Sequence, residues 1–245
     1  MAHSISTVRL YKDYTKIGGR SFFSGLLGRK NEVQVIKNSN FEVKSGEFCA
    51  IFGGNGCGKT TMIKLLSTLL FPTRGHVYID GYDIYKSCIA ARKLIGFVSS
   101  NSSGFYMKLT GRQNLDFFGQ LNNLPGKRTR CKIDELSEIL RFRPYLDTMF
   151  YEYSTGIRQR FSIARSLFHD PQIMLYDEPF RSLDSDICKD LESFLRVLVK
   201  RQERILLFTT LKRNEAVSAD RVFTIKNGIF SEEKLFNKKA DSCEA

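Results

Sequence analysis

The stretch GGNGCGKTT, residues 53–61, decides the fold. It follows the apolar run EFCAIF (47–52), which predicts a buried strand, and it leads into KTTMIKLLSTLL (59–70), whose apolar positions predict a helix. Glycines in such a turn let backbone N–H groups point inward, and the start of a helix adds partial positive charge, so the three pieces together form a cradle for phosphate. We therefore expect the chain to bind a nucleotide.

The residue types in this loop have separate tasks in phosphate binding. Lys59 is expected to reach the β- and γ-phosphates, and the hydroxyl of Thr60 is expected to bind Mg²⁺. With glycine at about 7% of residues, such a pattern arises by chance in roughly one chain of this length per hundred, and its strand and helix context lowers that further. The predicted nucleotide-binding residues here are Gly53, Gly54, Asn55, Gly56, Cys57, Gly58, Lys59, Thr60 and Thr61.

A second apolar run, IMLY (173–176), ends in two acids, Asp177 and Glu178. Open α/β sheets bind their ligands at the carboxyl ends of their strands. We expect Asp177 to hold Mg²⁺ and Glu178 to activate a water molecule as general base. Acids at strand ends often do no more than start a loop, but the phosphate loop favours the functional interpretation.

Between these motifs, the segment YSTGIRQRFSIARSLFHDP (153–171) predicts an amphipathic helix that Pro171 closes. Its apolar positions at helical spacing are Ile157, Phe161, Ala164 and Phe168. The small residues at its start are interpreted either as an ordinary helix cap or as a second phosphate site, which would serve a nucleotide held by another subunit.

The order of phosphate loop, STG-x-RQR helix, DEP and SLD (182–184) resembles the ATP-binding cassette (ABC) ATPases over nearly the whole chain. This resemblance implies an α/β fold in which a P-loop NTPase (RecA-like) core sheet carries an antiparallel β subdomain and an inserted helical subdomain. Residues 1–98 and 153–245 would form the catalytic core of a single nucleotide-binding domain, and residues 99–152 the helical subdomain. Within the latter, Thr110 and Gln113 predict a capping box.

The same resemblance assigns roles to individual residues. It makes Glu178 the catalytic base, Thr60 and Asp177 the metal ligands, and Asp184 the acid of the D-loop. Ser154, Thr155 and Gly156 would form the signature motif, which acts in trans on the nucleotide of a second cassette. Tyr14 matches the aromatic position that stacks on adenine, with Tyr11 as the rival for that role.

The implied protein is the ATP-binding subunit of a transporter, with ATP and Mg²⁺ as cofactors. It would pair with a second cassette, in a homo- or heterodimer, and drive a separate transmembrane permease. The motif wording is most similar to ABC-2 cassettes, which are often exporters. Two alternatives stay open: a degenerate nucleotide-binding half of a heterodimeric pair, and a soluble non-transport ABC protein, a class that commonly carries two cassettes in one chain.

Three motifs depart from the family pattern. The Q-loop glutamine is replaced around Ser100, where Asn101 is the possible substitute, and Tyr153 and Thr155 replace the usual leucine and glycine of the signature. The third departure is Leu211, which stands where the family places a histidine that contacts the γ-phosphate. Losing one positioned donor typically slows a reaction by about 10²- to 10³-fold, so we expect slow hydrolysis.

Bulk composition limits the remaining choices. No apolar run approaches the roughly 20 residues that span a bilayer, and the six cysteines form no C-x-x-C pair, which favours a reducing compartment. We expect a cytoplasmic protein, held on the inner face of a membrane by its permease. The net charge of +12 is interpreted as a solvated basic surface rather than a nucleic-acid site, because no recognition motif accompanies it. The insertion at 17–30 either touches lipid or a membrane subunit, or packs on its own domain.

Overall fold

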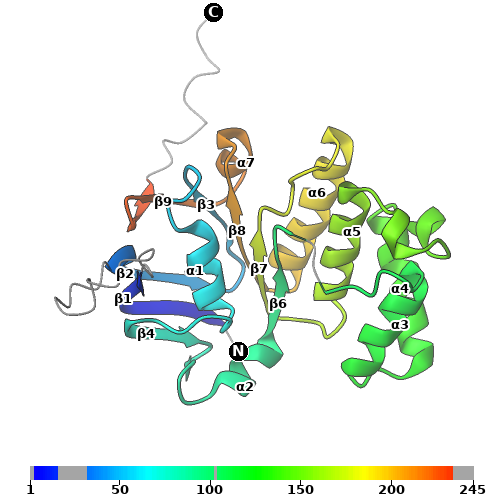
Figure 1. The fold of residues 1–245 in the computed structure, drawn as a ribbon, viewed down its shortest axis with the longest axis horizontal. Coiled ribbons are helices and arrows are strands. Elements are labelled where there is room, and N and C mark those ends of the chain that lie inside the picture. Colours follow the sequence, from blue (N-terminus) through cyan, green and yellow to red (C-terminus); the bar gives the residue numbers. More distant parts are fainter. Residues whose placement is uncertain (1–2, 16–31, 102–103, 234–245) are drawn as a thin grey trace, which may run out of the picture.

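The computed structural model describes residues 3–15, 32–101 and 104–233, and its strands form one ten-stranded sheet (Figure 1). The strand order is β5-β4-β1-β2-β10-β9-β3-β8-β7-β6. The strands are β1 (Ser4–Thr15), β2 (Glu32–Lys44), β3 (Phe48–Phe52), β4 (Arg74–Ile79), β5 (Tyr82–Asp83), β6 (Ile95–Val98), β7 (Ile173–Asp177), β8 (Ile205–Thr210), β9 (Arg221–Lys226) and β10 (Ile229–Glu233).

The sheet has an antiparallel and a parallel part. Strands β5, β4, β1 and β2 pair antiparallel, whereas β3, β8, β7 and β6 are all parallel, with β9 also parallel to β3. Strand β10 joins the two parts, because it pairs with β9 along its length and with β2 at Ile229 and Lys37. The predicted fold class, a parallel core sheet with an antiparallel β part and added helices, is confirmed.

Helices cover both faces of the parallel strands. They are α1 (Lys59–Leu66), α2 (Cys88–Leu94), α3 (Gly111–Leu121), α4 (Gly126–Ile139), α5 (Thr155–Ser166), α6 (Ser185–Arg201) and α7 (Arg213–Val217), with 3₁₀ turns at Arg143–Tyr145 and Phe150–Glu152. Side chains alternate along β3, so that Phe48 and Ala50 join the core under α5 and α6, while Cys49 and Ile51 join the core under α1. Strands buried on both faces are apolar throughout, which is why FCAIF and IMLY show no polar alternation.

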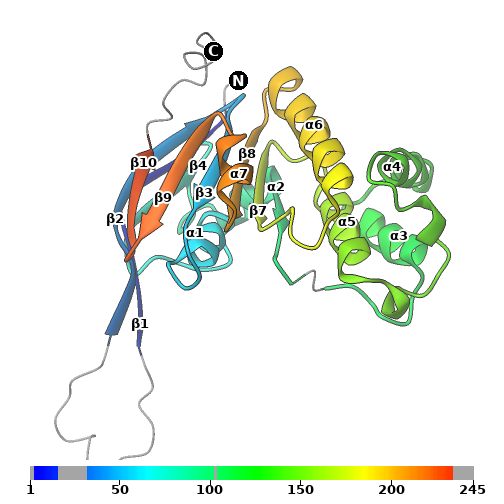
Figure 2. The same ribbon diagram turned by 90° about the horizontal axis from the view of Figure 1, so that it is seen from above.

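The helices α3 and α4 lie beyond α5, at the end of the molecule remote from the antiparallel strands (Figures 1 and 2). They fall within the segment 99–152 that we assigned to a helical subdomain. The predicted capping box starts α3: the Thr110 hydroxyl accepts from the Gln113 amide, and the Gln113 side chain accepts from the Thr110 amide. Leu115 of α3 and Ile133 of α4 share one core with Phe161 of α5.

Helix α1 is shorter than the apolar pattern predicts. It ends at Leu66 rather than near residue 70, and Leu69 is 53% exposed. The chain turns at Thr68, whose φ is 61°, and the amide of Leu69 donates to the carbonyl of Lys64 at 2.9 Å. This is the hydrogen bonding of a Schellman stop, which usually has glycine at the left-handed position. Threonine there gave no sequence signal.

Helix α5 also differs from its prediction. It ends at Ser166, five positions before Pro171, and it is buried on nearly every side rather than amphipathic. Two of its buried polar side chains bond to backbone carbonyls: Arg160 donates to the carbonyl of Arg141 at 3.0 Å, and Gln159 donates to the carbonyl of Pro179 at 3.3 Å.

The insertion at 17–30 lies outside the described residues, so its predicted role stays untested. Among the described helices, none combines the length and the apolar character needed to cross a membrane.

Candidate functional site

The loop after β3 ends at Gly58, a position where only glycine fits. Gly58 precedes the first residue of α1 with a φ of 113°, and a Cβ there would lie 3.0 Å from the carbonyl oxygen of Val35. The next side chain, Lys59, is 5% exposed, and its Nζ donates to the carbonyls of Gly53 at 2.8 Å and Gly54 at 2.9 Å. The ammonium group is thus folded over the loop it belongs to, bonded to backbone oxygens that are weak partners for a cation compared with phosphate.

Next to this loop, two hydroxyls meet one buried carboxylate. Asp177, the last residue of β7, is 2% exposed, and it accepts from Thr60 at 2.9 Å and from Thr209 at 2.7 Å. A carboxylate and a hydroxyl in contact are the oxygen ligands that Mg²⁺ takes in nucleotide sites, where the phosphates and water complete its shell. The residues predicted as metal ligands are therefore suited to Mg²⁺.

Glu178 is held at a strained turn. Its φ is 51°, its amide donates to the Thr209 hydroxyl at 3.0 Å, and its carboxylate lies 3.4 Å from the Arg181 guanidinium. The side chain faces a pocket formed by the loops that follow β3, β7 and β8. That pocket is lined by Asn55, Glu178, Arg181, Ser182, Thr210, Leu211, Lys212 and Glu215.

Leu211 lines the same pocket as Glu178 and is 40% exposed. The position that lacks the expected histidine is thus beside the predicted general base. Lys212, the next residue, has its Nζ 3.1 Å from the Glu215 carboxylate, which also accepts from Thr210.

At the start of α5, two side chains are exposed to solvent and one glycine is closely packed. Ser154 and Thr155 are exposed, and the Ser154 hydroxyl accepts from the amide of Ile157 at 3.3 Å. A Cβ on Gly156 would lie 2.6 Å from the carbonyl oxygen of Ser182, so only glycine fits there. The helix start therefore presses against the segment that leads into Asp184, which is exposed and precedes α6.

A second pocket opens beside this helix start. Its lining residues are Ser100, Asn101, Thr155, Arg158, Gln159, Arg181 and Ser182. The segment that replaces the Q-loop glutamine thus faces the predicted signature residues, and Arg181 belongs to both pockets.

The two aromatic candidates for adenine both lie on β1. Tyr11 has the guanidinium of Arg74 4.4 Å from its ring centroid, whereas Tyr14 has the Nζ of Lys12 at 5.3 Å and is 39% exposed. The face of Tyr11 is therefore the more closely covered of the two.

Two residues of this site were missed from the sequence. Thr209 holds both Asp177 and the amide of Glu178, and Arg181 contacts Glu178. The signal for Thr209 is a hydroxyl at the carboxyl end of the buried strand RILLFTT (204–210), and the signal for Arg181 is a cation between the motifs DEP and SLD.

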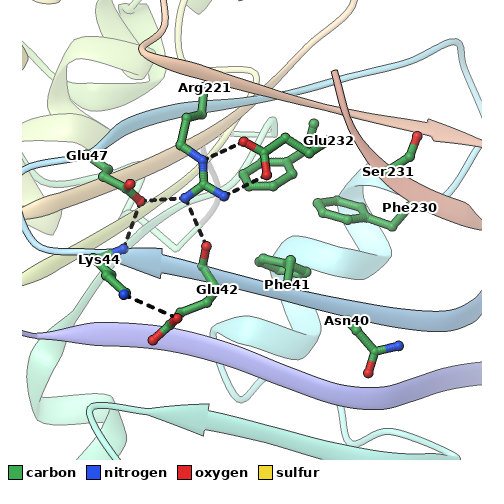
Figure 3. Close-up of a pocket in the computed structure, with 10 residues that line it drawn as sticks. Asn40, Phe41, Glu42, Lys44, Glu47, Arg221, Phe230, Ser231 and Glu232 are labelled. Carbon is green, nitrogen blue, oxygen red and sulfur yellow. Dashed lines mark hydrogen bonds and ion pairs between the residues drawn. The ribbon is translucent and has the colours of Figure 1, made fainter. Parts of the chain in front are cut away.

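Another pocket lies at the opposite ends of the strands, and the charged side chains that line it pair with one another (Figure 3). Arg221 crosses it, donating to the carboxylates of Glu232 and Glu47 at 2.8 Å each and to the carbonyl of Glu42 at 3.0 Å. The cation is satisfied from within, so this pocket is not the candidate site. It is lined by Asn40, Phe41, Glu42, Lys44, Glu47, Arg221, Phe223, Phe230, Ser231 and Glu232.

Comparison with known proteins agrees with this geometry. Residues 36–181 match the family model described as ABC transporter. The chain belongs to the ABC transporter family. It is 32% identical over 200 residues to the ABC transporter ATP-binding protein NatA of Bacillus subtilis (strain 168), covering 82% of this chain and 81% of that protein.

Further similarities extend the comparison. The chain is 32% identical to the daunorubicin resistance ATP-binding protein DrrA3 of Streptomyces coeruleorubidus, over 82% of this chain and 63% of that protein. Among solved structures, the dimeric ATP-binding cassette MJ0796 in a post-hydrolysis state with ADP and Pi superimposes with a TM-score of 0.83 at 27% identity, covering 95% of this chain and 99% of that one. ATP binding and hydrolysis are the characteristic activities of this family, so the chain is an ABC-type ATPase.

Proposed function

We propose that this ABC ATPase binds MgATP in the loop after β3 and hydrolyses it with Glu178 as general base, to drive a separate transmembrane permease. The observation that carries the proposal is the convergence of Lys59, Thr60, Asp177 and Glu178 at the carboxyl ends of β3 and β7. A cation, a hydroxyl and two carboxylates meet there in the arrangement that nucleotide phosphates require.

Each residue has a step in the proposed reaction. Lys59 exchanges its carbonyl partners for phosphate oxygens, which are stronger acceptors for an ammonium group. Thr60 and Asp177 would hold Mg²⁺, which would neutralise charge on the phosphates. Glu178 takes a proton from water as the water oxygen bonds to the γ-phosphorus. The bond from that phosphorus to the β,γ-bridging oxygen breaks, and ADP leaves with the electron pair.

The partners are the second part of the proposal. Ser154, Thr155 and Gly156 would face the nucleotide of a second cassette, since the first two are exposed at a helix start and the similar cassette MJ0796 is dimeric. The permease would place the chain on the cytoplasmic face of a membrane. An ABC-2 exporter is the proposed type. Two relatives that are each 32% identical to this chain are named for daunorubicin resistance and for sulfate/thiosulfate import.

Leu211 supports a second candidate function. Leucine donates no hydrogen bond, so the chain either hydrolyses ATP slowly or obtains the donor from another residue. In the first case it would serve as the degenerate half of a heterodimeric pair, binding nucleotide while its partner hydrolyses it. A hydrolysis rate that stays low with every cassette partner tested would favour that alternative.

Size-exclusion chromatography with and without MgATP tests the main proposal. Glu178→Gln should bind ATP, lose hydrolysis and accumulate as an ATP-dependent dimer, because the amide cannot accept the water proton. Lys59→Ala should bind no ATP and stay monomeric. Failure of the wild-type chain to bind ATP, alone or with its permease, would contradict the proposal.

A further inference from the structure

Arg181 stands where the two incomplete parts of the site meet. It lines the pocket of Glu178 and Leu211, and it also lines the pocket of Ser100 and Asn101. Those two pockets contain the positions at which this chain lacks the glutamine and the histidine of the family pattern. One cation therefore borders both missing polar groups.

The backbone fixes where Arg181 starts. Its amide donates to the carbonyl of Glu178 at 3.1 Å, which closes a tight turn directly after the strained residue. This turn sets the guanidinium and the Glu178 carboxylate side by side at the carboxyl end of β7.

The contact between Arg181 and Glu178 is weak as ion pairs go. At 3.4 Å it exceeds the roughly 2.7–2.9 Å of a charge-assisted hydrogen bond. The Arg181 side chain is 62% exposed, and a guanidinium group has five N–H donors in a planar fork that suits phosphate. Glu178 thus leaves most of the donor capacity available to a bound anion.

The other cation of the pocket, Lys212, is paired more closely. It is 63% exposed, about as much as Arg181, but its Nζ lies 3.1 Å from Glu215, and Glu215 is itself fixed by Thr210. Exchanging that partner for phosphate would leave the Glu215 carboxylate facing the phosphate charge. The geometry therefore favours Arg181 over Lys212.

We propose that Arg181 donates to the terminal phosphate of the bound nucleotide and supplies the transition-state contact that Leu211 cannot make. The inference rests on the proposed function, because it requires ATP in the loop after β3. On binding, the guanidinium exchanges the Glu178 carboxylate for the γ-phosphate, and the freed carboxylate accepts the proton of the attacking water. The expectation of slow hydrolysis considered Leu211 alone. With Arg181 as the donor, we expect hydrolysis at a rate ordinary for the family.

The test measures steady-state hydrolysis and ADP affinity of the full chain, with its permease if the chain alone is inactive. Arg181→Ala should lower kcat by about 10²-fold, the loss typical of one positioned donor. Its affinity for ADP should stay unchanged, because ADP lacks the terminal phosphate; general damage to the site would weaken ADP as well. Arg128→Ala is the matched control, since Arg128 is also 62% exposed and pairs with one acid, Asp170, far from the site.

Adding Leu211→His separates the two possible donors. In the Arg181→Ala background the histidine should recover at least tenfold in kcat, and in wild type it should change kcat by less than threefold, because a donor is already present.

Three results would overturn the inference: no loss of kcat in Arg181→Ala, a larger loss in Lys212→Ala, or a large gain from Leu211→His in wild type. Each of these leaves the proposed function standing, provided that Glu178→Gln still abolishes hydrolysis. Failure of the proposed function would give a different result: the wild-type chain would neither bind nor hydrolyse ATP.

Discussion

The charged side chains at the two ends of the parallel strands have different kinds of bonding partner. At the carboxyl ends of β3 and β7, Lys59 is bonded to backbone carbonyls, Asp177 to hydroxyls, and Glu178 to a guanidinium at 3.4 Å. At the amino ends of β3 and β9, Arg221 is bonded to two carboxylates at 2.8 Å each.

The amino ends contain a second closed network. Asp220, just before β9, accepts from the amide of Phe48 at 3.0 Å and from Lys200 at 2.7 Å, and it lies 3.4 Å from Arg196. These bonds tie the first residues of two neighbouring strands to helix α6. Charges that are fully paired within the chain stabilise it and have little left for a ligand.

The difference teaches how to separate function from stability in one sheet. Strand β3 contributes to both ends and its neighbours β7 and β9 belong to the same sheet, so the sheet positions each set equally well. Only the carboxyl ends leave cations and acids bonded to partners that a phosphate or a metal ion can displace. We therefore expect substitutions at the carboxyl ends to alter nucleotide affinity and rate, and substitutions at the amino ends to alter the free energy of unfolding.

The largest expected effect is that of Lys59→Ala on ATP affinity. Truncating one partner of a desolvated charge pair costs about 2–5 kcal/mol, which is at least about 30-fold in Kd. The free energy of unfolding should change little, since Lys59 bonds only to backbone carbonyls of its own loop. Isothermal titration with ATP and urea unfolding measure the two quantities. A large loss of stability with unchanged affinity would break the comparison.

Arg221→Ala should show the reverse. Removing the guanidinium leaves Glu47 and Glu232 without their cation at the edge of a pocket where Arg221 is 27% exposed. The penalty for a fully buried pair is about 3–5 kcal/mol, so we expect about 2 kcal/mol here and a fall in Tm of about 4–8 °C. ATP affinity should not change. Arg213→Ala is the control, because its pair with Glu233 is more exposed and should matter less.

Gly156→Ala tests whether the carboxyl side also contains tight packing. The added methyl group would lie 2.6 Å from the carbonyl oxygen of Ser182. Such overpacking costs about 1–3 kcal/mol of unfolding free energy, and shifting Ser182 should also lower the hydrolysis rate. Gly126→Ala is the matched control, since nothing lies within 4 Å of a Cβ there. Equal stability of the two variants would show that the backbone at Ser182 moves away from the added methyl group at little cost in free energy.

The smallest expected effect is the loss, at low pH, of the stability that Asp220 contributes. Burial by itself raises the pKa of Asp220, but the hydrogen bonds from Lys200 and from the amide of Phe48 more than offset it, so the pKa lies below its usual value. Stability from this group is present above the unfolded pKa of about 4 and is lost as pH falls through the lower pKa of the folded state. Asp220→Asn should therefore cost about 1 kcal/mol at about pH 7, and less at about pH 2.

Urea unfolding at the two pH values measures this difference. Asp147→Asn is the control: the hydrogen bond from Arg112 lowers the pKa of Asp147, but the side chain is 75% exposed, so solvent screens the pair. A cost for Asp220→Asn that is the same at both pH values would show that the charge on Asp220 does not carry the effect.

Local signals in the sequence predicted the parts of the molecule that depend on neighbouring residues. The strand before the phosphate loop, the strand before Asp177 and the cap made by Thr110 and Gln113 are confirmed. Each follows from side chains within a few positions of one another. The stop of α1 at Thr68 was missed because the usual residue for that left-handed turn is glycine.

Contacts between distant segments could not be predicted in this way. Thr209 reaches Asp177 from a neighbouring strand, and Arg221 meets Glu47 across 174 positions of sequence. Such pairs depend on strand order and register, which a single sequence does not state. The same limit hid Arg181, whose neighbours Leu211 and Asn55 come from two other loops.

The most direct test of the account is the shift in Tm that MgATP produces in three proteins: wild type, Arg221→Ala and Lys59→Ala. A ligand at about 100 times its Kd stabilises the folded state by about 2.7 kcal/mol, which is roughly 5–10 °C for a chain of this size. We predict that shift for wild type and, from a lower starting Tm, an equal shift for Arg221→Ala. For Lys59→Ala, whose Kd should be at least about 30-fold higher, the shift should be at most about 2–4 °C. A full shift in Lys59→Ala, or its loss in Arg221→Ala, would contradict the assignment of nucleotide binding to the carboxyl ends of the strands.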